Sequence, residues 1–308
     1  MADQKSFGKI GVLAGGPSSE REISLRSGNA VYKALRQEGI DAVLLDVAGD
    51  VKDAIKNNRV DVAFIALHGR FGEDGTVQRI LDEMHVPYTG SGAEASQRAL
   101  DKITAKEAFI ASGIPVPKHV VFEKGSFKIE EADALGLPVV VKPHLEGSSI
   151  GLSVVREKEA LCAAIMKAFE YGTKVLVEEY INGRELTVGV LADKALPVIE
   201  IVTRQKVYDY QAKYSDPETK YLVPAPIEKD VFAKAQELGV RSHQALGCRC
   251  FSRIDMMLDA SGGLFVLEAN TIPGMTERSL LPKAAQAAGL SFGRLCVKLV
   301  EDALVRWA

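Results

Sequence analysis

The sequence lacks the features that mark secreted, membrane-spanning or nucleic-acid-binding proteins. Four cysteines in 308 residues are too few for a disulfide framework, and the one close pair, Cys248 and Cys250, has no second pair to complete a zinc site. No apolar run approaches the roughly 18 residues of a membrane span, and the first ten residues contain no apolar signal core. A formal net charge of −3 disfavours binding to nucleic acid. We therefore expect a cytoplasmic protein with reduced, structural cysteines.

The residues that are present have the proportions of an ordinary globular protein. Hydrophobic residues make up 47% of the chain and charged residues 26%. The length is about twice that of a usual domain, so we expect two or three packed units that share a site.

The N-terminal third alternates predicted strands with predicted helices. Buried strands are predicted at 10–13, 42–47 and 60–67, and helices at 23–35, 51–57 and 76–84. This order predicts a parallel sheet, whose ligands bind beyond the carboxyl ends of the strands. Two Gly-rich loops, 14–19 and 68–75, fall at that edge and are candidate ligand-binding loops.

The pattern changes after a predicted helix at 93–112, which runs into the Pro-rich segment GIPVP. Residues 118–181 alternate short strands with a helix at 157–171, which indicates a small α+β unit. Long β segments follow, with a helix at 228–246, a hairpin at 251–269 and two C-terminal helices. We predict three domains, at 1–95, 96–181 and 182–308.

The predicted hairpin carries the most informative polar pattern. A turn centred between Ser261 and Gly262 places residue 255 opposite 268 and residue 253 opposite 270. Because strand side chains alternate between faces, one face is polar and the other apolar. The polar face contains Arg253, Asp255, Glu268 and Asn270, and the apolar face contains Ile254, Met256, Leu267 and Ala269.

The two opposed carboxylates of this hairpin repel each other unless a cation lies between them. The oxygen donors of Asp255, Glu268 and Asn270 favour magnesium held jointly with substrate phosphates. A solvated face neutralised by Arg253 is the alternative.

A second candidate site is the segment 142–151, where Lys142 ends a buried apolar run and a Gly/Ser loop follows. Backbone N–H groups beside a lysine suit a phosphate, and a plain hairpin with a surface lysine explains the segment equally well. The chain has no P-loop motif. Residues 90–95 match a dinucleotide-binding pattern, but not in the first strand–helix turn, where that motif belongs.

Two further side chains lie in the Gly-rich loops. His68 is a catalytic base or orients its loop, and the absence of a serine or cysteine nucleophile motif favours the second interpretation. Glu20 begins the first predicted helix, where an acid is favourable against the helix dipole. Its position at the ligand-facing edge also suits it to binding an amine.

Taken together, four motifs resemble the D-alanine–D-alanine ligase family of the ATP-grasp superfamily. They are HGRFGEDGTVQ (68–78), VVVKPHLEGSSIG (139–151), YDYQAKY (208–214) and RIDMMLDASGGLFVLEANTIPGMT (253–276). The resemblance covers nearly the whole chain. It implies an α/β fold, in part α+β, of the ATP-grasp type, with three domains, an N-terminal parallel Rossmann-like sheet, and ATP between the central and C-terminal domains.

The resemblance also implies roles for individual residues. ATP would contact Lys102 and Lys142 through its phosphates, Glu178 through adenine and Glu185 through ribose. Lys213 would be a further cofactor-binding residue. Two Mg²⁺ or Mn²⁺ ions would bind Asp255, Glu268 and Asn270. The ammonium of the first D-alanine would bind Glu20, which is linked to Ser148 and Tyr214. The oxyanion would face Arg253 and the backbone of Gly274, and the carboxylate of the second D-alanine would bind Ser279 and Leu280.

The implied reaction is the ATP-dependent ligation of two D-alanine molecules through an acyl phosphate, which supplies peptidoglycan precursors for the bacterial cell wall. The family suggests a homodimer. A D-alanine–D-lactate ligase is the nearest alternative, and Tyr214 in the AKYS context favours the dipeptide enzyme.

Residues 205–222, polar but with four tyrosines, are expected to form a lid over the ligands. Arg79 stands where the family usually has a small residue, so the start of the helix predicted at 76–84 is expected to pack differently.

Overall fold

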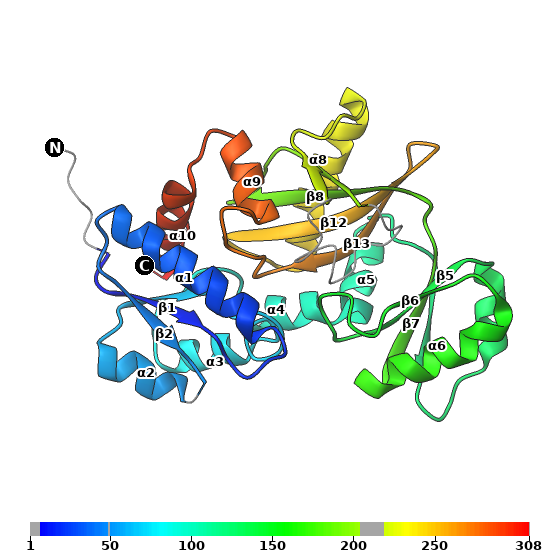
Figure 1. Cartoon of the computed structure of the whole chain (residues 1–308), viewed down its shortest axis with the longest axis horizontal. Helices are drawn as coiled ribbons and strands as arrows, with labels where there is room; N and C mark the ends of the chain where they lie inside the picture. Colours follow the sequence, from blue (N-terminus) through cyan, green and yellow to red (C-terminus); the bar gives the residue numbers. More distant parts are fainter. Residues whose placement is uncertain (1–6, 49, 204–218, 308) are drawn as a thin grey trace.

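The computed structural model describes residues 7–48, 50–203 and 219–307, which form three sheets with helices packed around them (Figure 1). Sheet A is parallel, with the strand order β2 (Ala42–Asp46), β1 (Ile10–Ala14) and β3 (Val62–Ile65). The helices between and after these strands are α1 (Arg21–Gln37), α2 (Val51–Asn58) and α3 (Thr76–Glu83). The predicted alternation of strands and helices is confirmed.

Sheet A is buried on both faces, which explains its nearly continuous apolar strands. Ile10 and Val12 of β1 pack in one core cluster with residues of α1, whereas Leu13 packs in a second cluster with residues of α2 and α3. The Gly-rich loops 15–20 and 68–75 follow β1 and β3, so both lie at the carboxyl edge of the sheet.

The helix predicted at 93–112 is two helices, α4 (Ala93–Leu100) and α5 (Lys102–Ala111). Asp101 between them is extended, and its side chain accepts hydrogen bonds from the backbone N–H groups of Ile103, at 3.0 Å, and Thr104, at 3.4 Å. An aspartate in this position caps a helix start and ends the one before it. The break places Lys102 in the first turn of α5.

Sheet B is antiparallel, in the order β4 (His119–Glu123), β7 (Lys174–Glu179), β5 (Val139–Pro143) and β6 (Ser153–Val155). The helix predicted at 157–171 is α-helical only as α6 (Leu161–Ala168), with 3₁₀ turns at Lys158–Ala160 and Phe169–Tyr171; a further 3₁₀ segment spans Ile129–Leu135. Val139 and Val141 pack with α6 in one core cluster. The alternate residues, Val140 and Lys142, therefore face the other way.

Sheet C has the order β11 (Lys220–Leu222), β10 (Ile199–Val202), β8 (Gly183–Leu191), β12 (Phe251–Asp259) and β13 (Leu264–Asn270), with β9 (Lys194–Ala195) beside β8. Helix α8 (Lys229–Ala245) and helix α5 pack on one face through a shared core that includes Phe109, Leu186 and Ile254. Residues 96–117 thus contribute to the core of sheet C, and the predicted domain boundaries stay a prediction.

The β12–β13 hairpin has the predicted pairing at its polar end. Asp255 lies opposite Glu268 and Arg253 opposite Asn270. The register shifts between Asp255 and Met256, because Met256 pairs with Val266. The prediction that Leu267 lies on the apolar face was wrong: this bulge turns Leu267 toward the cavity described below, and Val266 takes its place in the core.

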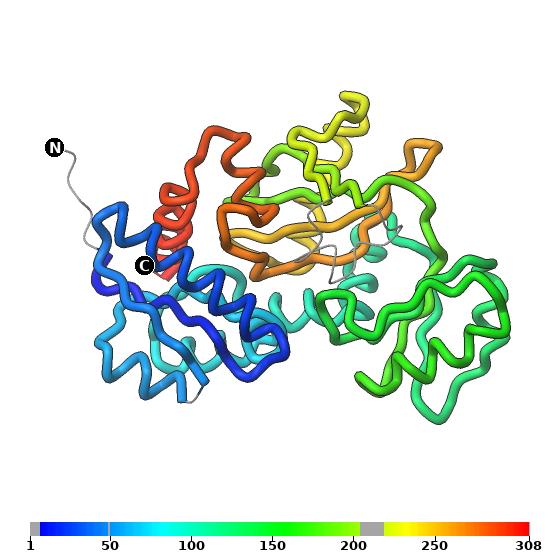
Figure 2. Tube along the Cα trace, in the orientation of Figure 1, coloured from blue at the N-terminus to red at the C-terminus, as the bar shows by residue number. Residues whose placement is uncertain are grey.

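The two ends of the described chain share one core (Figure 2). Helix α10 (Phe292–Trp307) lies beside α1, and α9 (Leu280–Ala287) joins it to sheet C. Leu295, Leu299 and Val300 pack into the same cluster as Ile10 and Val12. The C-terminal helices therefore complete one side of the N-terminal sheet.

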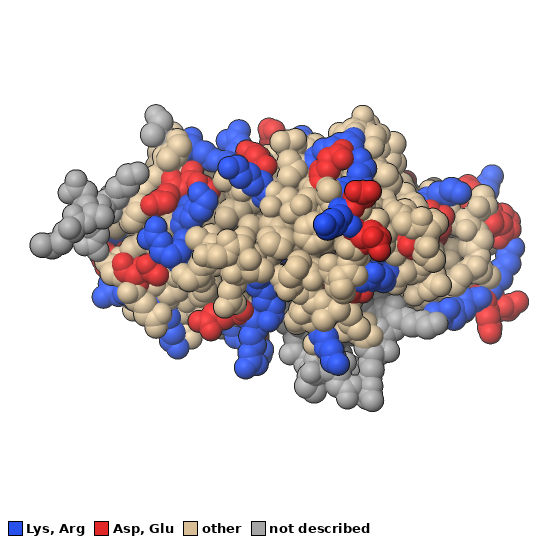
Figure 3. Space-filling view, turned by 90° about the horizontal axis from the view of Figure 1, so that it is seen from above, with Lys and Arg blue, Asp and Glu red and all other residues tan. Residues whose placement is uncertain are grey.

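The surface charge, the helices and the cysteines each bear on what the composition predicts. On the face shown in Figure 3, basic and acidic side chains are interspersed rather than segregated. Among the described residues, no helix is both long and apolar enough to span a bilayer. All four cysteines lie in the described part of the chain and are unpaired, and burial raises the pKa of Cys248 to about 11 and that of Cys250 to about 12. Cys248, Cys250 and Cys296 are buried and Cys162 is exposed, and the reduced state of the cysteines stays a prediction.

Candidate active site

A cavity lies between the face of sheet B that α6 leaves uncovered and the hairpin face of sheet C. Its walls are apolar, formed by Val140 and Val154 on one side and by Met257 and Leu267 on the other. Glu179 at the end of β7 and the next two residues, Tyr180 and Ile181, also line it. An apolar space between two sheets suits a flat heterocycle.

The charged end of this cavity is lined by Lys142 and Glu178, with the buried Lys106 behind Glu178. The Glu178 carboxylate lies 2.8 Å from Nζ of Lys142 and 2.9 Å from Nζ of Lys106, one oxygen facing each lysine. Burial alone would raise the pKa of Glu178, but Lys142 and then Lys106 outweigh burial and hold the pKa below its usual range. Glu178 is therefore a carboxylate that holds two lysines beside the cavity.

The hairpin supplies the other charged side of the cavity. Arg253 donates to both oxygens of Asp255, from Nε at 2.9 Å and from Nη2 at 2.7 Å. Asn270 and Thr187 also donate to Asp255, at 3.1 Å and 2.6 Å. Glu268 lies 3.5 Å from Nζ of Lys102. Arg253 therefore neutralises Asp255, but the face is not the solvated one of the alternative weighed from the sequence, because the Asp255 side chain is only 7% exposed.

The predicted metal-binding set consists of two carboxylates and one amide. Among the described residues, no group of three or more His, Cys, Asp or Glu side chains is placed to hold a metal ion. Asp255 and Glu268 are cross-strand neighbours that both line the cavity, and Asn270 follows on the same face. All three supply hard oxygen donors, so the residues fit magnesium by their chemistry, and metal binding stays a prediction.

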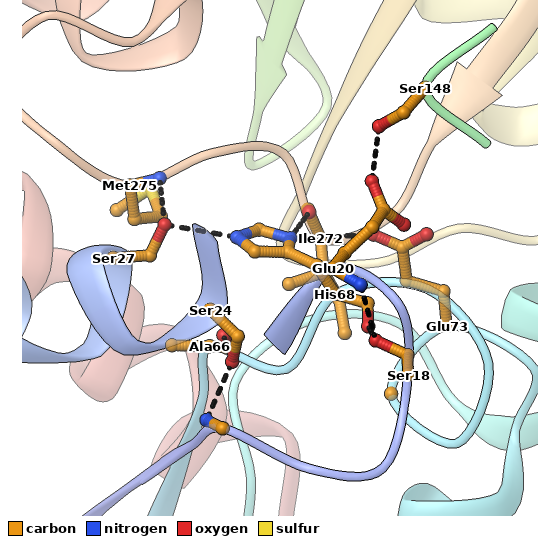
Figure 4. A network of polar contacts seen from close by, with 12 residues as sticks. Ser18, Glu20, Ser24, Ser27, Ala66, His68, Glu73, Ser148, Ile272 and Met275 are labelled. Atoms are coloured by element: carbon orange, nitrogen blue, oxygen red, sulfur yellow. Dashed lines mark hydrogen bonds and ion pairs between the residues drawn. The ribbon is translucent and has the colours of Figure 1, made fainter. Parts of the chain in front are cut away.

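Three loops meet at Glu20 (Figure 4). Ser148, in the Gly/Ser loop after β5, donates a short hydrogen bond to the Glu20 carboxylate. The Glu20 backbone N–H bonds to the Ser18 hydroxyl at 3.2 Å, and that hydroxyl donates to the carbonyl of His68 at 2.6 Å. Because Gly147 and Ser149 line the cavity, the Gly/Ser loop separates Glu20 from the cavity by the thickness of one chain segment.

His68 is buried and orients the loops around it. One ring nitrogen lies 2.9 Å from the Ser27 hydroxyl and the other 3.0 Å from the carbonyl oxygen of Ile272 (Figure 4). The Ser27 hydroxyl also accepts a hydrogen bond from the backbone N–H of Met275 at 3.2 Å. These contacts tie sheet A to the segment after the hairpin, as expected of a histidine that orients its loop.

Gly274 and Ser279 lie in one turn before α9. The Ser279 hydroxyl accepts a hydrogen bond from the N–H of Thr276 at 3.1 Å, and a Cβ atom on Gly274 would lie 3.0 Å from it. Leu280 begins the helix. The turn thus places a backbone N–H group, a hydroxyl and a helix start close together, an arrangement suited to an anion.

Sequence comparisons place this arrangement in a family. Residues 109–301 match the family model described as D-ala D-ala ligase C-terminus, and residues 48–91 match D-ala D-ala ligase N-terminus. D-alanine–D-alanine ligases of Citrifermentans bemidjiense and Geotalea uraniireducens are 46% and 45% identical over 298 and 304 residues. The alignments cover 97% and 99% of this chain and 97% and 98% of those proteins. The chain belongs to the D-alanine–D-alanine ligase family.

Solved structures agree with this assignment. The D-alanine–D-alanine ligase of Bacillus anthracis, crystallised with ATP, superposes with a TM-score of 0.87 at 32% identity and covers 97% of this chain and 98% of its own. The VanG D-Ala:D-Ser ligase of Enterococcus faecalis gives 0.82 at 33% identity, covering 95% and 98%. The fold is ATP-grasp, and ligases named for different second substrates share it.

The remaining residues predicted from the resemblance lie partly inside and partly outside the described chain. Glu185 lines the cavity. Arg79 is exposed and donates to Gln97 at 2.6 Å, while its backbone N–H bonds to Gly75, so α3 begins normally despite the unusual residue. Lys213 and Tyr214 lie outside the described residues, as does most of the predicted lid; residues 220–222 form β11. Lys106 was not predicted.

Gly69→Ala is expected to raise the KM for the first amino acid about tenfold, as for the loss of one charged hydrogen bond. Gly69 has a φ of +71°, and a Cβ atom there would lie 2.7 Å from Oε2 of Glu20, displacing that carboxylate. Gly125→Ala is the matched control, because Gly125 has a φ of +87° with no described atom within 4 Å of its Cβ position. Equal KM values for the two variants, measured by ATP turnover, would contradict the role of Glu20.

Glu73→Gln is expected to flatten the dependence of the melting temperature on pH. Burial raises the pKa of Glu73 above its usual 4.5, and Glu20 adds to this, while His68 opposes it. A carboxyl with a raised pKa in the folded state stabilises the fold below its ordinary pKa and loses that contribution as the pH rises through the raised value. Between pH 4 and 8 the melting temperature should therefore fall more steeply with rising pH for the original chain than for Glu73→Gln. The exposed Glu170→Gln is the control, and parallel curves for all three proteins would refute the assignment.

Proposed function

We propose that this protein ligates two D-alanine molecules to D-alanyl-D-alanine at the expense of ATP, for peptidoglycan precursors in bacterial cell wall biogenesis. The observation that carries the proposal is the position of the loop 146–149. Its Gly147 and Ser149 line a cavity that also contains Lys102, Lys142, Asp255 and Glu268, while its Ser148 bonds to Glu20 on the other side. A nucleotide site and an amine site thus share one loop.

ATP would bind with its adenine at the apolar end of the cavity and its phosphates at the charged end. Adenine takes the apolar space near residues 179–181 with Glu178 behind it, and Glu185 receives the ribose hydroxyls. The phosphates lie toward Lys102 and Lys142. Lys213 is a further proposed ATP-binding residue. Asp255, Glu268 and Asn270 would hold two Mg²⁺ or Mn²⁺ ions, whose charge would offset that of the transferring phosphoryl group.

The chemistry follows from the poor reactivity of a carboxylate toward an amine, because its leaving group would be oxide. Glu20, with Ser148 and Tyr214, binds the ammonium of the first D-alanine. The carboxylate of that D-alanine attacks the terminal phosphorus of ATP, and ADP leaves. An acyl phosphate results. The amine of the second D-alanine, held through its carboxylate by Ser279 and Leu280, then attacks the acyl carbon. Arg253 and the N–H of Gly274 stabilise the oxyanion until phosphate leaves.

Phosphate release from ATP with Mg²⁺ tests this function, with the product identified by mass spectrometry. D-Alanine should give phosphate and a D-alanyl-D-alanine mass, and L-alanine should give neither. D-Serine and D-lactate, each paired with D-alanine, test the second substrate. A mixed product formed in preference to the dipeptide would change the proposed substrate, and no D-alanine-dependent phosphate release would overturn the function.

We further propose that the enzyme acts in the cytoplasm as a homodimer. Light scattering coupled to size-exclusion chromatography gives the mass directly. A mass near twice the 33.2 kDa of one chain supports the dimer, and a mass of one chain at micromolar concentration contradicts it.

A further inference from the structure

Lys106 is the most deeply buried lysine of the described chain, with 0% of its surface exposed. It lies one helical turn after Lys102 in α5, so both lysines project from the same side of the helix. Its Nζ lies 2.9 Å from Oε1 of Glu178. Lys106 is absent from the residues that line the cavity, whereas Lys102, Lys142 and Glu178 line it.

Glu178 and its two lysine partners together carry an excess of positive charge. Lys142 binds the second oxygen, Oε2, at 2.8 Å, and the side chains of Lys142 and Glu178 are 9% and 3% exposed. Burial lowers the pKa of Lys106, and Glu178 opposes that shift. Two ammonium groups and one carboxylate sum to +1, although a single lysine would already neutralise Glu178.

A purely structural role does not explain the second lysine. Burying an ammonium group costs free energy that an ion pair rarely returns in full, and an apolar side chain of similar length usually fills such a position at least as well. The excess charge is useful only to an anion nearby. The cavity beside Lys142 provides the place for one.

Building on the proposed function, we propose that Lys106 is a positioning residue for the triphosphate of ATP, acting through Glu178. By neutralising Glu178, it leaves the charge of Lys142 available to the phosphates. Without Lys106, Glu178 and Lys142 form an ion pair with no net charge. Lys142 is then held by the carboxylate more strongly, and the electrostatic attraction for the phosphate chain falls.

Lys106→Met tests this role by the binding of ATP and of adenosine, both without D-alanine. ATP binding is followed by calorimetry, and adenosine binding by its competition with ATP. The expected result is a tenfold to hundredfold weaker affinity for ATP, about the effect of one unit charge at short range, and an affinity for adenosine within about twofold of the original. An equal loss for both ligands, or no loss for ATP, would overturn the proposal.

The double variant Lys106→Met/Glu178→Gln supplies the matched control. It removes one positive and one negative charge, so the sum at the cavity returns to +1, now on Lys142 alone. Because Glu178 also lies behind the adenine space, the double variant is compared with Glu178→Gln alone, and adding Lys106→Met to that variant should change the affinity for ATP by no more than about twofold. A tenfold or larger further loss in the double variant overturns the proposal, since Lys106 would then act through packing and not through Glu178.

Two measurements keep these outcomes distinct. Lys106→Arg retains the charge and should bind ATP nearly normally, so this variant tests the role if Lys106→Met does not fold. A Lys106→Arg protein that is folded by circular dichroism but has lost its affinity for ATP would contradict the proposed role of Lys106. The ATP titration of the unsubstituted chain separates the two levels of the argument. Failure of that titration overturns the proposed function, whereas normal ATP binding with no selective loss in Lys106→Met overturns only the role of Lys106.

Discussion

Replacing Glu268 with glutamine is expected to lower kcat at least a hundredfold while leaving the protein folded. Glu268 lines the cavity opposite Asp255 and lies 3.5 Å from Nζ of Lys102. Glutamine keeps the shape but removes the charge, which weakens both metal binding and the position of the lysine during phosphoryl transfer. Single electrostatic contacts to a developing charge are typically worth about 3 kcal/mol or more, or roughly a hundredfold in rate.

Glu123→Gln is the control for this prediction. Glu123 is also a strand glutamate facing a lysine, Lys174 at 3.1 Å, but its side chain is 58% exposed on the outer strand of sheet B. Steady-state kinetics at saturating magnesium should show a normal kcat for this variant. A normal kcat for Glu268→Gln under the same conditions would remove Glu268 from the metal site.

Arg253→Lys is expected to lower kcat about a hundredfold with little change in KM. The guanidinium holds both oxygens of Asp255, at 2.9 Å and 2.7 Å, and its remaining N–H groups are fixed by that fork. Lysine keeps the charge but cannot hold a carboxylate in two places and present a donor in a fixed direction. A contact made mainly with the oxyanion affects kcat, whereas a contact made equally with the substrate affects KM.

Arg184→Lys is a close control, because Arg184 makes the same kind of fork to Glu200, at 2.7 Å and 2.6 Å, elsewhere on sheet C. Its kcat should remain within a few-fold of the original. Should Arg253→Lys raise only KM, or should both variants lose kcat equally, the oxyanion role of Arg253 would be wrong.

The hairpin shows how far the sequence can predict this site. Strict alternation along two strands and a turn at Ser261 and Gly262 were enough to pair Asp255 with Glu268. The same alternation placed Leu267 wrongly, because it contains no signal for a bulge. The bulge depends on packing, since Val266 rather than Leu267 enters the core beside Met256.

Other differences arise from capping and from tertiary contacts. The break between α4 and α5 has a local signal, because Asp101 can cap the helix that follows, and apolar spacing outweighed that signal in the prediction of one helix. Lys106 has no local signal. A lysine in the middle of a helix is usually a solvent-facing residue, and only the approach of β7 to α5 makes it a partner of Glu178.

The core shared by the chain's two ends has a consequence for biosynthesis. About 290 residues separate Ile10 from Val300, which pack in one cluster. A ribosome adding 5–20 residues per second needs about 15 to 60 s to make that length. During this time β1 and α1 exist without the helix that covers them. The N-terminal sheet is thus the first to be synthesised and the last to be completed, and we expect the nascent chain to depend on chaperones until α10 emerges.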